Sequence, residues 1–178
     1  LLDEASGTYN IPYLRKYFPQ GGVVLVECVQ RTQGLMVPKG NPLGIKEFKD
    51  IVGKRYVNRQ KGSGTRILCD FLAHQQGLDT SLIPGYEREE YTHTAVAAAI
   101  AAGTADAGLG ILSAARIYDL DFVPICEEQY DLLVDENAFE LPMVQRLLAV
   151  LRGEEFARRL AQMGGYTLLH PGEVRQWN

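Results

Sequence analysis

Short apolar, β-branched runs alternate along this sequence with segments of helical periodicity, and glycines separate most of them. Residues 23–29 and 55–58 have the composition of strands, whereas residues 64–76 place apolar side chains on one helical face. We expect further strands at 34–37, 106–111, 121–125 and 130–134, and helices at 12–18, 45–51, 95–102, 142–151 and 154–163. This alternation predicts an α/β fold in which crossover helices join parallel strands.

The composition excludes several classes of protein. Apolar residues make up 46% of the 178 positions, which is typical of a globular chain and not of a disordered one. There are 18 Lys and Arg against 22 Asp and Glu, so the formal net charge is -4. A mildly acidic chain is a poor candidate for binding nucleic acid as a whole, and any basic site must be local.

Three cysteines, Cys28, Cys69 and Cys126, are widely spaced and match neither a metal site nor a disulfide framework. We predict that they are buried free thiols, which favours a cytoplasmic, reducing location. The longest apolar run, residues 94–102, is too short to span a bilayer. Because the chain starts with Leu1, it resembles a fragment, and a removed N-terminal signal would instead place the protein in the periplasm.

The loop RQKGSGTR at residues 59–66 combines two glycines, two hydroxyl residues and several basic groups at the start of a predicted helix. The first backbone N–H groups of a helix lack intrahelical acceptors, and the helix dipole favours negative charge there. We therefore predict a non-catalytic anion site formed by Ser63, Gly64, Thr65 and Arg66, with Asn58 and Arg59 before them. The alternative is a capped helix start with no ligand.

Known phosphate-binding loops do not match this stretch. A P-loop requires a glycine, four further residues and then Gly-Lys-Ser/Thr, which this stretch lacks. The dinucleotide fingerprint requires a third glycine where Ile67 stands. We therefore discount nucleotide hydrolysis and dehydrogenase chemistry.

A second loop, Tyr91-Thr92-His93-Thr94, also opens a helix, which is rich in alanine. His93 and Thr94 are the candidate ligand contacts here, although a lone histidine in such a place is more often structural. Ligands of α/β sheets bind beyond the carboxyl ends of the strands, where both loops are expected. The two helix starts are therefore predicted to converge on one site.

Five stretches of the sequence together carry a resemblance to a known family. Two of them are NRQKGSGTR at residues 58–66 and THTAVAAAIAAGTADAGLG at residues 92–110. The other three are LLDE at residues 1–4, Tyr9-Asn10, and EQYDL at residues 128–132. The set resembles the periplasmic-binding-protein-like (type 2) domain that is attached to helix-turn-helix regulators and to molybdopterin biosynthesis proteins. It is also similar to LysR substrate-binding domains and to molybdate- and tungstate-binding proteins.

The resemblance implies two α/β lobes with parallel sheets, joined by crossover strands that act as a hinge. The first lobe would comprise residues 1–41 and 115–178, and the second residues 42–114. Tyr130 would add a ligand contact from the first lobe. The usual domain begins with a strand, a helix and a second strand before LLDE, so the first lobe is expected to be truncated at its N-terminus.

The function expected from these observations is non-enzymatic binding or sensing of a small anion. The resemblance suggests molybdate, tungstate or a molybdopterin-like phosphate ester, and no cofactor, metal, nucleic acid or membrane is expected as a partner of this segment. Two alternatives remain. One is an enzyme module of molybdopterin biosynthesis with His93 as general base, and the other is a ligand-free effector domain that forms a homodimer.

Overall fold

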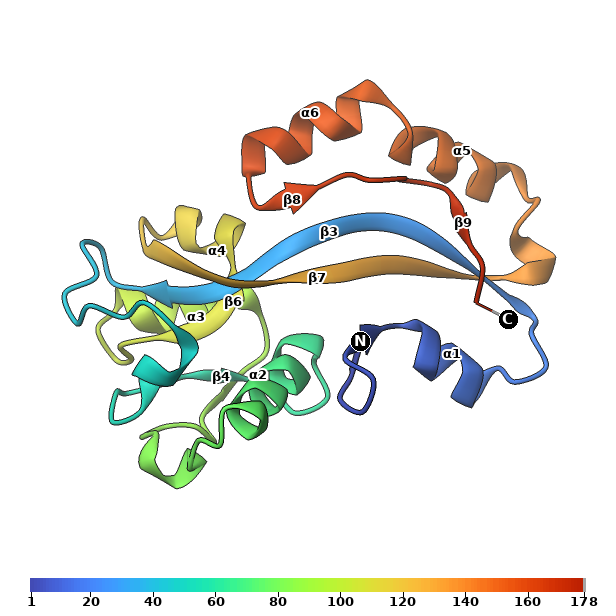
Figure 1. Ribbon diagram of the computed structural model, residues 1–178. Coiled ribbons are helices and arrows are strands. Elements are labelled where there is room, and N and C mark those ends of the chain that lie inside the picture. Colours follow the sequence, from blue (N-terminus) through green and yellow to red (C-terminus); the bar gives the residue numbers. More distant parts are fainter. Residues whose placement is uncertain (178) are drawn as a thin grey trace. The chain divides into compact units, whose positions relative to one another are not determined.

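The structure is a computed structural model, and it describes residues 1–177 (Figure 1). Its α-helices are α1 (Ile11–Tyr17), α2 (Gly64–Gln75), α3 (His93–Ala101), α4 (Leu112–Ile117), α5 (Pro142–Leu151) and α6 (Glu154–Met163). Its strands are β1 (Leu2–Asp3), β2 (Thr8–Tyr9), β3 (Val23–Val37), β4 (Asn58–Arg59), β5 (Glu89–Glu90), β6 (Gly108–Ile111), β7 (Asp121–Asp135), β8 (Tyr166–Thr167) and β9 (Val174–Arg175). In the described part of the chain, 3-10 turns are formed by Phe48–Ile51, Thr80–Leu82 and Glu136–Ala138.

The chain divides into two compact units, as the expected two-lobed α/β class requires. Unit 1 contains residues 1–31 and 128–178, and unit 2 contains residues 32–127. The divisions differ from the boundaries expected at 41/42 and 114/115. They fall inside β3 and β7, so residues 32–37 of β3 and residues 121–127 of β7 belong to unit 2.

Both long strands were expected as pairs of shorter ones. Residues 23–29 and 34–37 form the single strand β3, and residues 121–125 and 130–134 form the single strand β7. The polar residues between the apolar runs suggested breaks, but in the structure they pair with each other: Arg31 binds Glu128 at 2.9 Å, and Thr32 donates to Glu127 at 2.8 Å. Both strands therefore run without a break through these polar residues, because the side chains pair between β3 and β7.

Unit 2 contains the parallel pairing that the sequence predicts. β4 pairs in parallel with β5, and Tyr56 forms a parallel bridge with Ala107 just before β6. β6 itself pairs antiparallel with β3, so parallel pairing does not extend to the long strands. The core packs α3 and α4 against these strands, and its buried members are Met36, Val57, Val96, Ala97, Ala99, Ile100, Ala105, Ala114 and Ala115.

Two glycines of unit 2 stand where backbone passes too close for a side chain. A Cβ on Gly108 would lie 2.8 Å from the Val57 carbonyl oxygen, and one on Gly85 would lie 2.3 Å from that of Tyr56. Gly85 also has a φ of +84°, which other residues rarely adopt. The strands of unit 2 therefore depend on glycine for their close packing.

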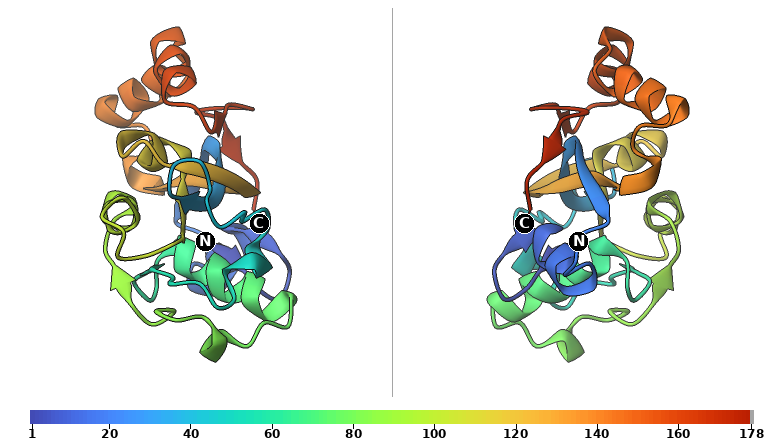
Figure 2. Two further views of the ribbon diagram at one scale, coloured as in Figure 1. Left: turned by 90° about the vertical axis from the view of Figure 1, so that its left-hand side faces the viewer. Right: turned by 90° about the vertical axis from the view of Figure 1, so that its right-hand side faces the viewer.

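In unit 1, β8 and β9 pair antiparallel with β3. Helices α5 and α6 lie on one side of β3 and β7, and α1 lies on the other, as the views of Figures 1 and 2 agree. The buried residues on the α5 and α6 side are Val26, Cys28, Val29, Leu148 and Leu151, and those on the α1 side are Leu14, Leu25 and Trp177.

The predicted helices agree closely with the structure, and the shorter elements agree less well. α5 and α6 have the expected bounds, whereas residues 45–51 contain only a 3-10 turn. α4 was not expected, because it follows β6 without an intervening turn signal. Cys28 and Cys69 are buried free thiols, as predicted, and Cys126 is a partly exposed one.

Candidate functional site

Two loops of unit 2 lie side by side because the strands before them are in parallel register. Asn58 pairs with Glu89 and Arg59 with Glu90, and the N–H of Gln60 then donates to the carbonyl of Glu90 at 3.2 Å. α2 begins after the first loop and α3 after the second. Both helix N-termini therefore follow the carboxyl ends of neighbouring parallel strands, where ligands of α/β sheets bind.

The first helix start is capped by Ser63. Gly62 turns the chain with a φ of +87°, and the N–H of Ser63 donates to the Gln60 carbonyl at 3.2 Å. The Ser63 Oγ accepts the N–H of Arg66 at 3.2 Å. The cap uses the N–H of Arg66, and the N–H groups of Gly64 and Thr65 precede it in the first turn of the helix.

The second helix start has the same construction. Thr92 is the N-cap of α3, and its Oγ1 accepts the N–H of Ala95 at 3.0 Å. The hydroxyl of Thr94 lies 3.0 Å from that of Thr92, and both side chains are exposed. Each loop thus presents hydroxyl groups and first-turn N–H groups at the same edge of the β4–β5 pair.

Arg59 and Asn58 hold this edge together. The Arg59 Nη2 donates to the carbonyl of Tyr91 at 3.1 Å, and its Nε donates to Gln60 Oε1 at 3.1 Å. Asn58 is buried, and its amide nitrogen donates to the Tyr86 carbonyl at 3.2 Å. Arg59 therefore links the two loops, while Asn58 anchors β4 from below.

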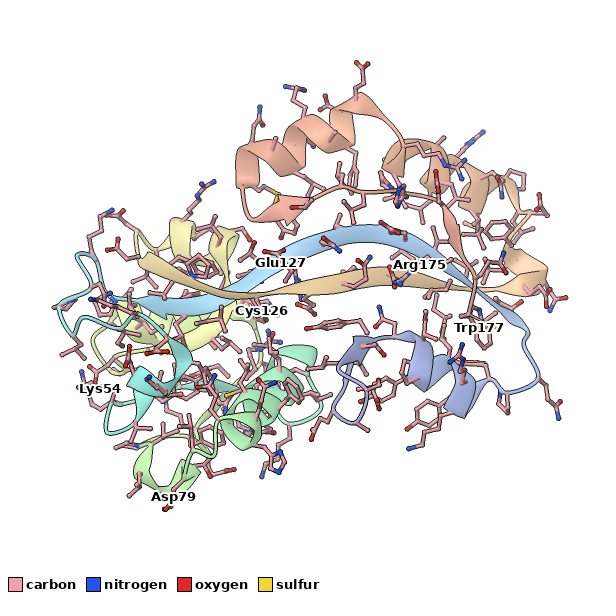
Figure 3. All side chains as sticks on the ribbon, viewed as in Figure 1. Lys54, Asp79, Cys126, Glu127, Arg175 and Trp177 are labelled. Atoms are coloured by element: carbon pink, nitrogen blue, oxygen red, sulfur yellow. The ribbon has the colours of Figure 1, made fainter. Side chains whose placement is uncertain are left out.

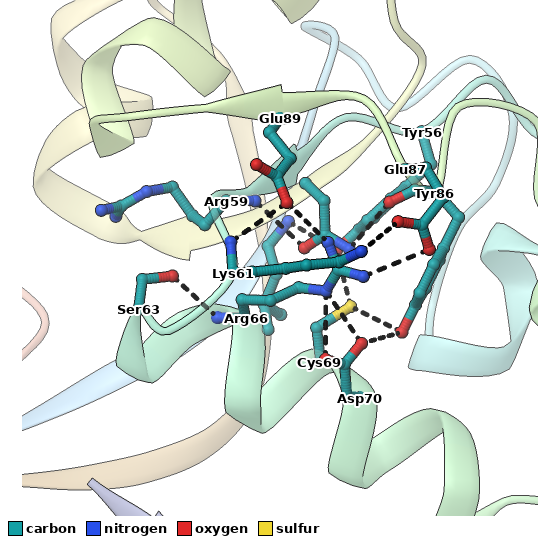
Figure 4. A network of polar contacts seen from close by, with 12 residues as sticks. Tyr56, Arg59, Lys61, Ser63, Arg66, Cys69, Asp70, Tyr86, Glu87 and Glu89 are labelled. Atoms are coloured by element: carbon teal, nitrogen blue, oxygen red, sulfur yellow. Dashed lines mark hydrogen bonds and ion pairs between the residues drawn. The ribbon is translucent and has the colours of Figure 1, made fainter.

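Arg66 was expected to reach a ligand, but its guanidinium is surrounded by the protein's own acidic groups (Figure 4). It lies 2.9 Å from Asp70, 3.3 Å from Glu87 and 3.4 Å from Glu89, and its side chain is only 4% exposed. The ring of Tyr86 covers it at 5.1 Å. These partners neutralise the charge of Arg66, so its role in this structure is to hold α2 against β5 and the segment before it.

The same network holds the first loop. Glu89 Oε1 also accepts the backbone N–H of Lys61 at 3.1 Å, and the Lys61 ammonium pairs with Glu87 at 3.1 Å. The hydrogen bond from Lys61 lowers the pKa of Glu87 below its ordinary value. The charge of Lys61 is therefore also paired with a carboxylate of the same unit.

Cys69 and two tyrosines lie beneath this network. The Cys69 Sγ is 3.4 Å from the Tyr56 hydroxyl and 3.6 Å from the Tyr86 hydroxyl, and the Tyr86 hydroxyl donates to Asp70 at 2.8 Å. Burial raises the pKa of the Cys69 thiol, and burial likewise raises the pKa of Tyr56. A buried thiol with a raised pKa is a poor nucleophile, which agrees with a structural role.

Gln33 is a residue of this region that the sequence did not indicate. Its Nε2 donates to the Thr65 Oγ1 at 3.0 Å, and both residues are buried. Gln33 lies on β3, 32 positions before Thr65, and no local pattern links the two. Gln33 belongs to the polar stretch 30–33 of β3, so its sequence neighbours give no signal that it contacts Thr65.

His93 lies over β6. It is half-buried, and a Cβ on Gly110 would approach its Nδ1 to 3.4 Å and the Met36 Cε to 2.6 Å. His93 therefore lies at the start of α3, close to Gly110 of β6.

Tyr130 belongs to unit 1, whereas the other expected site residues belong to unit 2. Its ring stacks under the guanidinium of Arg31 at 5.3 Å, and the side chain is 45% exposed.

Among residues 1–177, the structure contains no cluster of three or more potential metal ligands. No helix in this part of the chain has the length and apolar character needed to cross a membrane.

The PBP superfamily domain matches residues 1–152 of the sequence. The chain belongs to this superfamily. YvgK of Bacillus subtilis (strain 168), which is described as an uncharacterized protein, is 34% identical over 176 residues. That alignment covers 98% of this chain but only 56% of YvgK, so the chain spans about half the length of this relative.

Solved structures of the PBP type have the same fold. Peb3 from Campylobacter jejuni matches with a TM-score of 0.58 and 21% identity, covering 82% of this chain and 68% of Peb3. A second structure of Peb3, bound to L-phospholactate, matches with a TM-score of 0.53 and 17% identity over the same shares of the chains. The regulatory domain of MetR, a LysR family regulator from Neisseria meningitidis, matches at 0.58 with 11% identity, covering 85% and 70%. The expected likeness to PBP-like domains and to LysR substrate-binding domains is thereby confirmed.

Proposed function

We propose that this domain binds or senses a small oxyanion, and that the starts of α2 and α3 supply the ligand contacts. The observation that carries this proposal is the parallel register of β4 and β5, which puts both capped helix starts at one edge of unit 2. The PBP-like fold supports a role in binding a small ligand. Helix N-termini with hydroxyl residues and glycines are suitable sites for anions.

The proposed contacts are the backbone N–H groups of Gly64 and Thr65, the hydroxyls of Ser63 and Thr94, and His93 at the second start. Arg59 supports them by joining the two loops. Arg66 no longer belongs to the proposed ligand contacts, because three carboxylates already neutralise it. Tyr130 stays a predicted contact from unit 1.

The chemistry of these donors favours a fully ionised tetrahedral anion. With the charge of Arg66 internally balanced, the site consists mainly of neutral dipoles, which stabilise a compact dianion through several short hydrogen bonds. Molybdate and tungstate have this form, as do sulfate and the phosphate group of an ester. The phospholactate bound by Peb3 supports the last class.

The test is the thermal unfolding of the chain in millimolar molybdate, tungstate and sulfate. A ligand that binds only the folded state stabilises it by about 2.7 kcal/mol at a hundred times Kd, so the melting temperature should rise. The double variant Ser63→Gly/Thr94→Ala should lose most of this rise. Glycine is accepted at an N-cap at a cost of only a few tenths of a kcal/mol, so the variant should remain folded.

Ser81→Ala is the matched control, because it removes a hydroxyl from the distant Thr80–Leu82 turn of the same unit. It should leave the anion-dependent rise intact. If none of the three anions raises the melting temperature, or if the double variant retains the full rise, the proposed site is wrong.

A further inference from the structure

Unit 1 contains a pocket that shares no residue with the oxyanion site proposed for unit 2. Its volume is about 660 Å³, within the range of small-molecule sites. The pocket is lined from the N-terminal loop, the start of α1, β3, β7 and β9, all within unit 1. Its polar walls include Arg15, Gln30, Gln129 and Arg175, and Ile11 and Pro12 are among its apolar ones.

A buried carboxylate behind the pocket fixes its main cation. The side chain of Asp131 is 1% exposed and pairs with the Arg175 Nη1 at 2.5 Å. Two amides complete its hydrogen bonds, since Asn10 Nδ2 and Gln129 Nε2 each donate to Asp131 at 2.8 Å. Three segments of the chain, the loop at Asn10, β7 and β9, thus meet at one carboxylate. This carboxylate holds the guanidinium of Arg175, which Figure 3 labels, in a defined orientation.

The pocket retains unused donors. Asp131 takes one nitrogen of Arg175, and the Nε and Nη2 of that guanidinium have no acceptor among the described residues. Arg15 is similar: its Nε donates to the Trp177 carbonyl at 3.1 Å, and its two terminal nitrogens have no partner in residues 1–177. A planar guanidinium with free N–H groups binds carboxylate and phosphate oxygens in a two-point geometry.

The charge of the pocket is also suited to an anion. Two arginines line it, and no Asp or Glu is among the lining residues. Asp131 balances only one of the two positive charges. The volume of the pocket leaves room for an organic group beside the charged one, and the Gln30 and Gln129 amides and the apolar walls would surround that group.

We propose that this pocket, the Arg175 pocket, binds a small organic anion that carries a carboxylate or a phosphate group. Arg175 holds the anionic group, Arg15 adds a second charge, and Ile11 and Pro12 contact the apolar part. The site lies wholly within unit 1, so it is independent of the oxyanion site proposed for unit 2.

The chain carries its own reporter for this site. Trp177 is the single tryptophan, its carbonyl accepts the Arg15 Nε, and its side chain is buried with Leu14 and Leu25. Tryptophan fluorescence therefore reports on unit 1 and contains no contribution from a tryptophan in unit 2. The probes are L-phospholactate and inorganic phosphate, titrated into the intact chain and followed by fluorescence and by calorimetry.

We expect a saturable fluorescence change with L-phospholactate. Arg15→Gln should weaken this binding about tenfold to a hundredfold, as loss of a charge-assisted hydrogen bond does. Arg175→Lys is the second variant, because lysine can still pair with Asp131 but lacks the free fork, and it should weaken binding to a similar degree. Arg146→Gln removes an exposed charge from α5 and should leave the affinity unchanged.

The same titration separates the two proposed sites. The Ser63→Gly/Thr94→Ala variant should keep the full fluorescence response if the Arg175 pocket binds the anion. A response that this variant loses while Arg15→Gln and Arg175→Lys retain it would overturn the Arg175 pocket and support the unit 2 site. The absence of any saturable response with either probe would also overturn it.

Discussion

Arg66 carries a full positive charge into a position almost closed to water, where three carboxylates and the Tyr86 ring surround it. An arginine in this position contributes to the packing of α2 as well as to its charge balance. The carboxylates themselves are partly exposed, so they can regain water if the arginine is removed. The cost of removing it is therefore below that of leaving a fully buried charge unpaired.

We expect Arg66→Met to lower the free energy of unfolding by about 1–3 kcal/mol, through the loss of several charge-assisted hydrogen bonds. Urea unfolding measures the change. Lys61→Met is the matched control. Its ammonium is exposed and, among residues 1–177, pairs with Glu87 alone, so its removal should cost less than about 1 kcal/mol. Equal costs for the two variants would contradict the structural role of Arg66.

Asp106 predicts a dependence of stability on pH. Hydrogen bonds from Arg55 lower the pKa of Asp106 below its ordinary value, at distances of 2.6 Å to Nη2 and 2.9 Å to the backbone N–H. A carboxyl with a lowered pKa in the folded state stabilises the protein above its unfolded pKa of about 3.9. This stability is lost as the pH falls further, through the folded pKa.

Urea midpoints measured from pH 5 down to pH 2 should therefore fall more steeply for the natural chain than for Asp106→Asn. The asparagine variant should already be less stable at pH 5, and the two curves should converge in acid. Parallel curves would mean that Asp106 does not contribute through its charge.

The sequence could predict single residues only where the signal was local. Ser63 and Thr92 cap helices because hydroxyl residues before a helix do so, and both loops reach the same edge as expected. The partners of Arg66 could not be inferred, because Glu87 and Glu89 lie more than 20 positions away. A separation of 32 positions likewise concealed the bond between Gln33 and Thr65.

At the scale of elements, β6 depends on two glycines with different neighbours. A Cβ on Gly108 would meet the rigid Val57 carbonyl at 2.8 Å and the Val96 Cγ1 at 2.5 Å. A Cβ on Gly110 would meet mainly the end of the flexible Met36 side chain, at 2.6 Å. Only the second neighbour can move without shifting the backbone.

Gly108→Ala should therefore lower the free energy of unfolding by about 1–3 kcal/mol, which is typical of overpacking, and Gly110→Ala should cost less. Thermal or urea unfolding of the two variants tests the order. The reverse order would show that β6 is held by contacts at Gly110 and not by its approach to Val57.

Helices were easier to predict than strands in this chain. The 3.6-residue periodicity of α5 and α6 and the glycines that follow their ends are local signals. The length of β3 and β7 depends on cross-strand partners such as Arg31 and Glu128, which no pattern within either strand reveals. The two-residue strands β8 and β9 have no signal beyond their pairing with β3.

At the scale of the whole chain, the two units differ in how the sequence forms them. Unit 2 is one continuous segment, whereas unit 1 combines both ends of the chain. The family resemblance predicted this discontinuous arrangement, which composition and periodicity alone could not supply. The division between the units falls within continuous strands, where no loop marks it.

Because unit 2 is continuous and has its own core, the segment 32–127 should fold alone. We expect its far-UV circular dichroism to show α2 and α3 and its urea unfolding to be cooperative, although it should be less stable than the full chain. The segment 128–178, which lacks the β3 half of its sheet, is the control and should not fold. A disordered 32–127 segment would contradict the independence of unit 2.

The bonds that join Arg59 and Gln60 to Tyr91 and Glu90 also limit how relatives of this protein can differ in length. An added residue in either loop would break these bonds and move the following helix away from its neighbour. Insertions and deletions should therefore be rare in these two loops among homologues. They should be more common at surface turns such as Pro38–Gly44, whose length does not set the position of either helix.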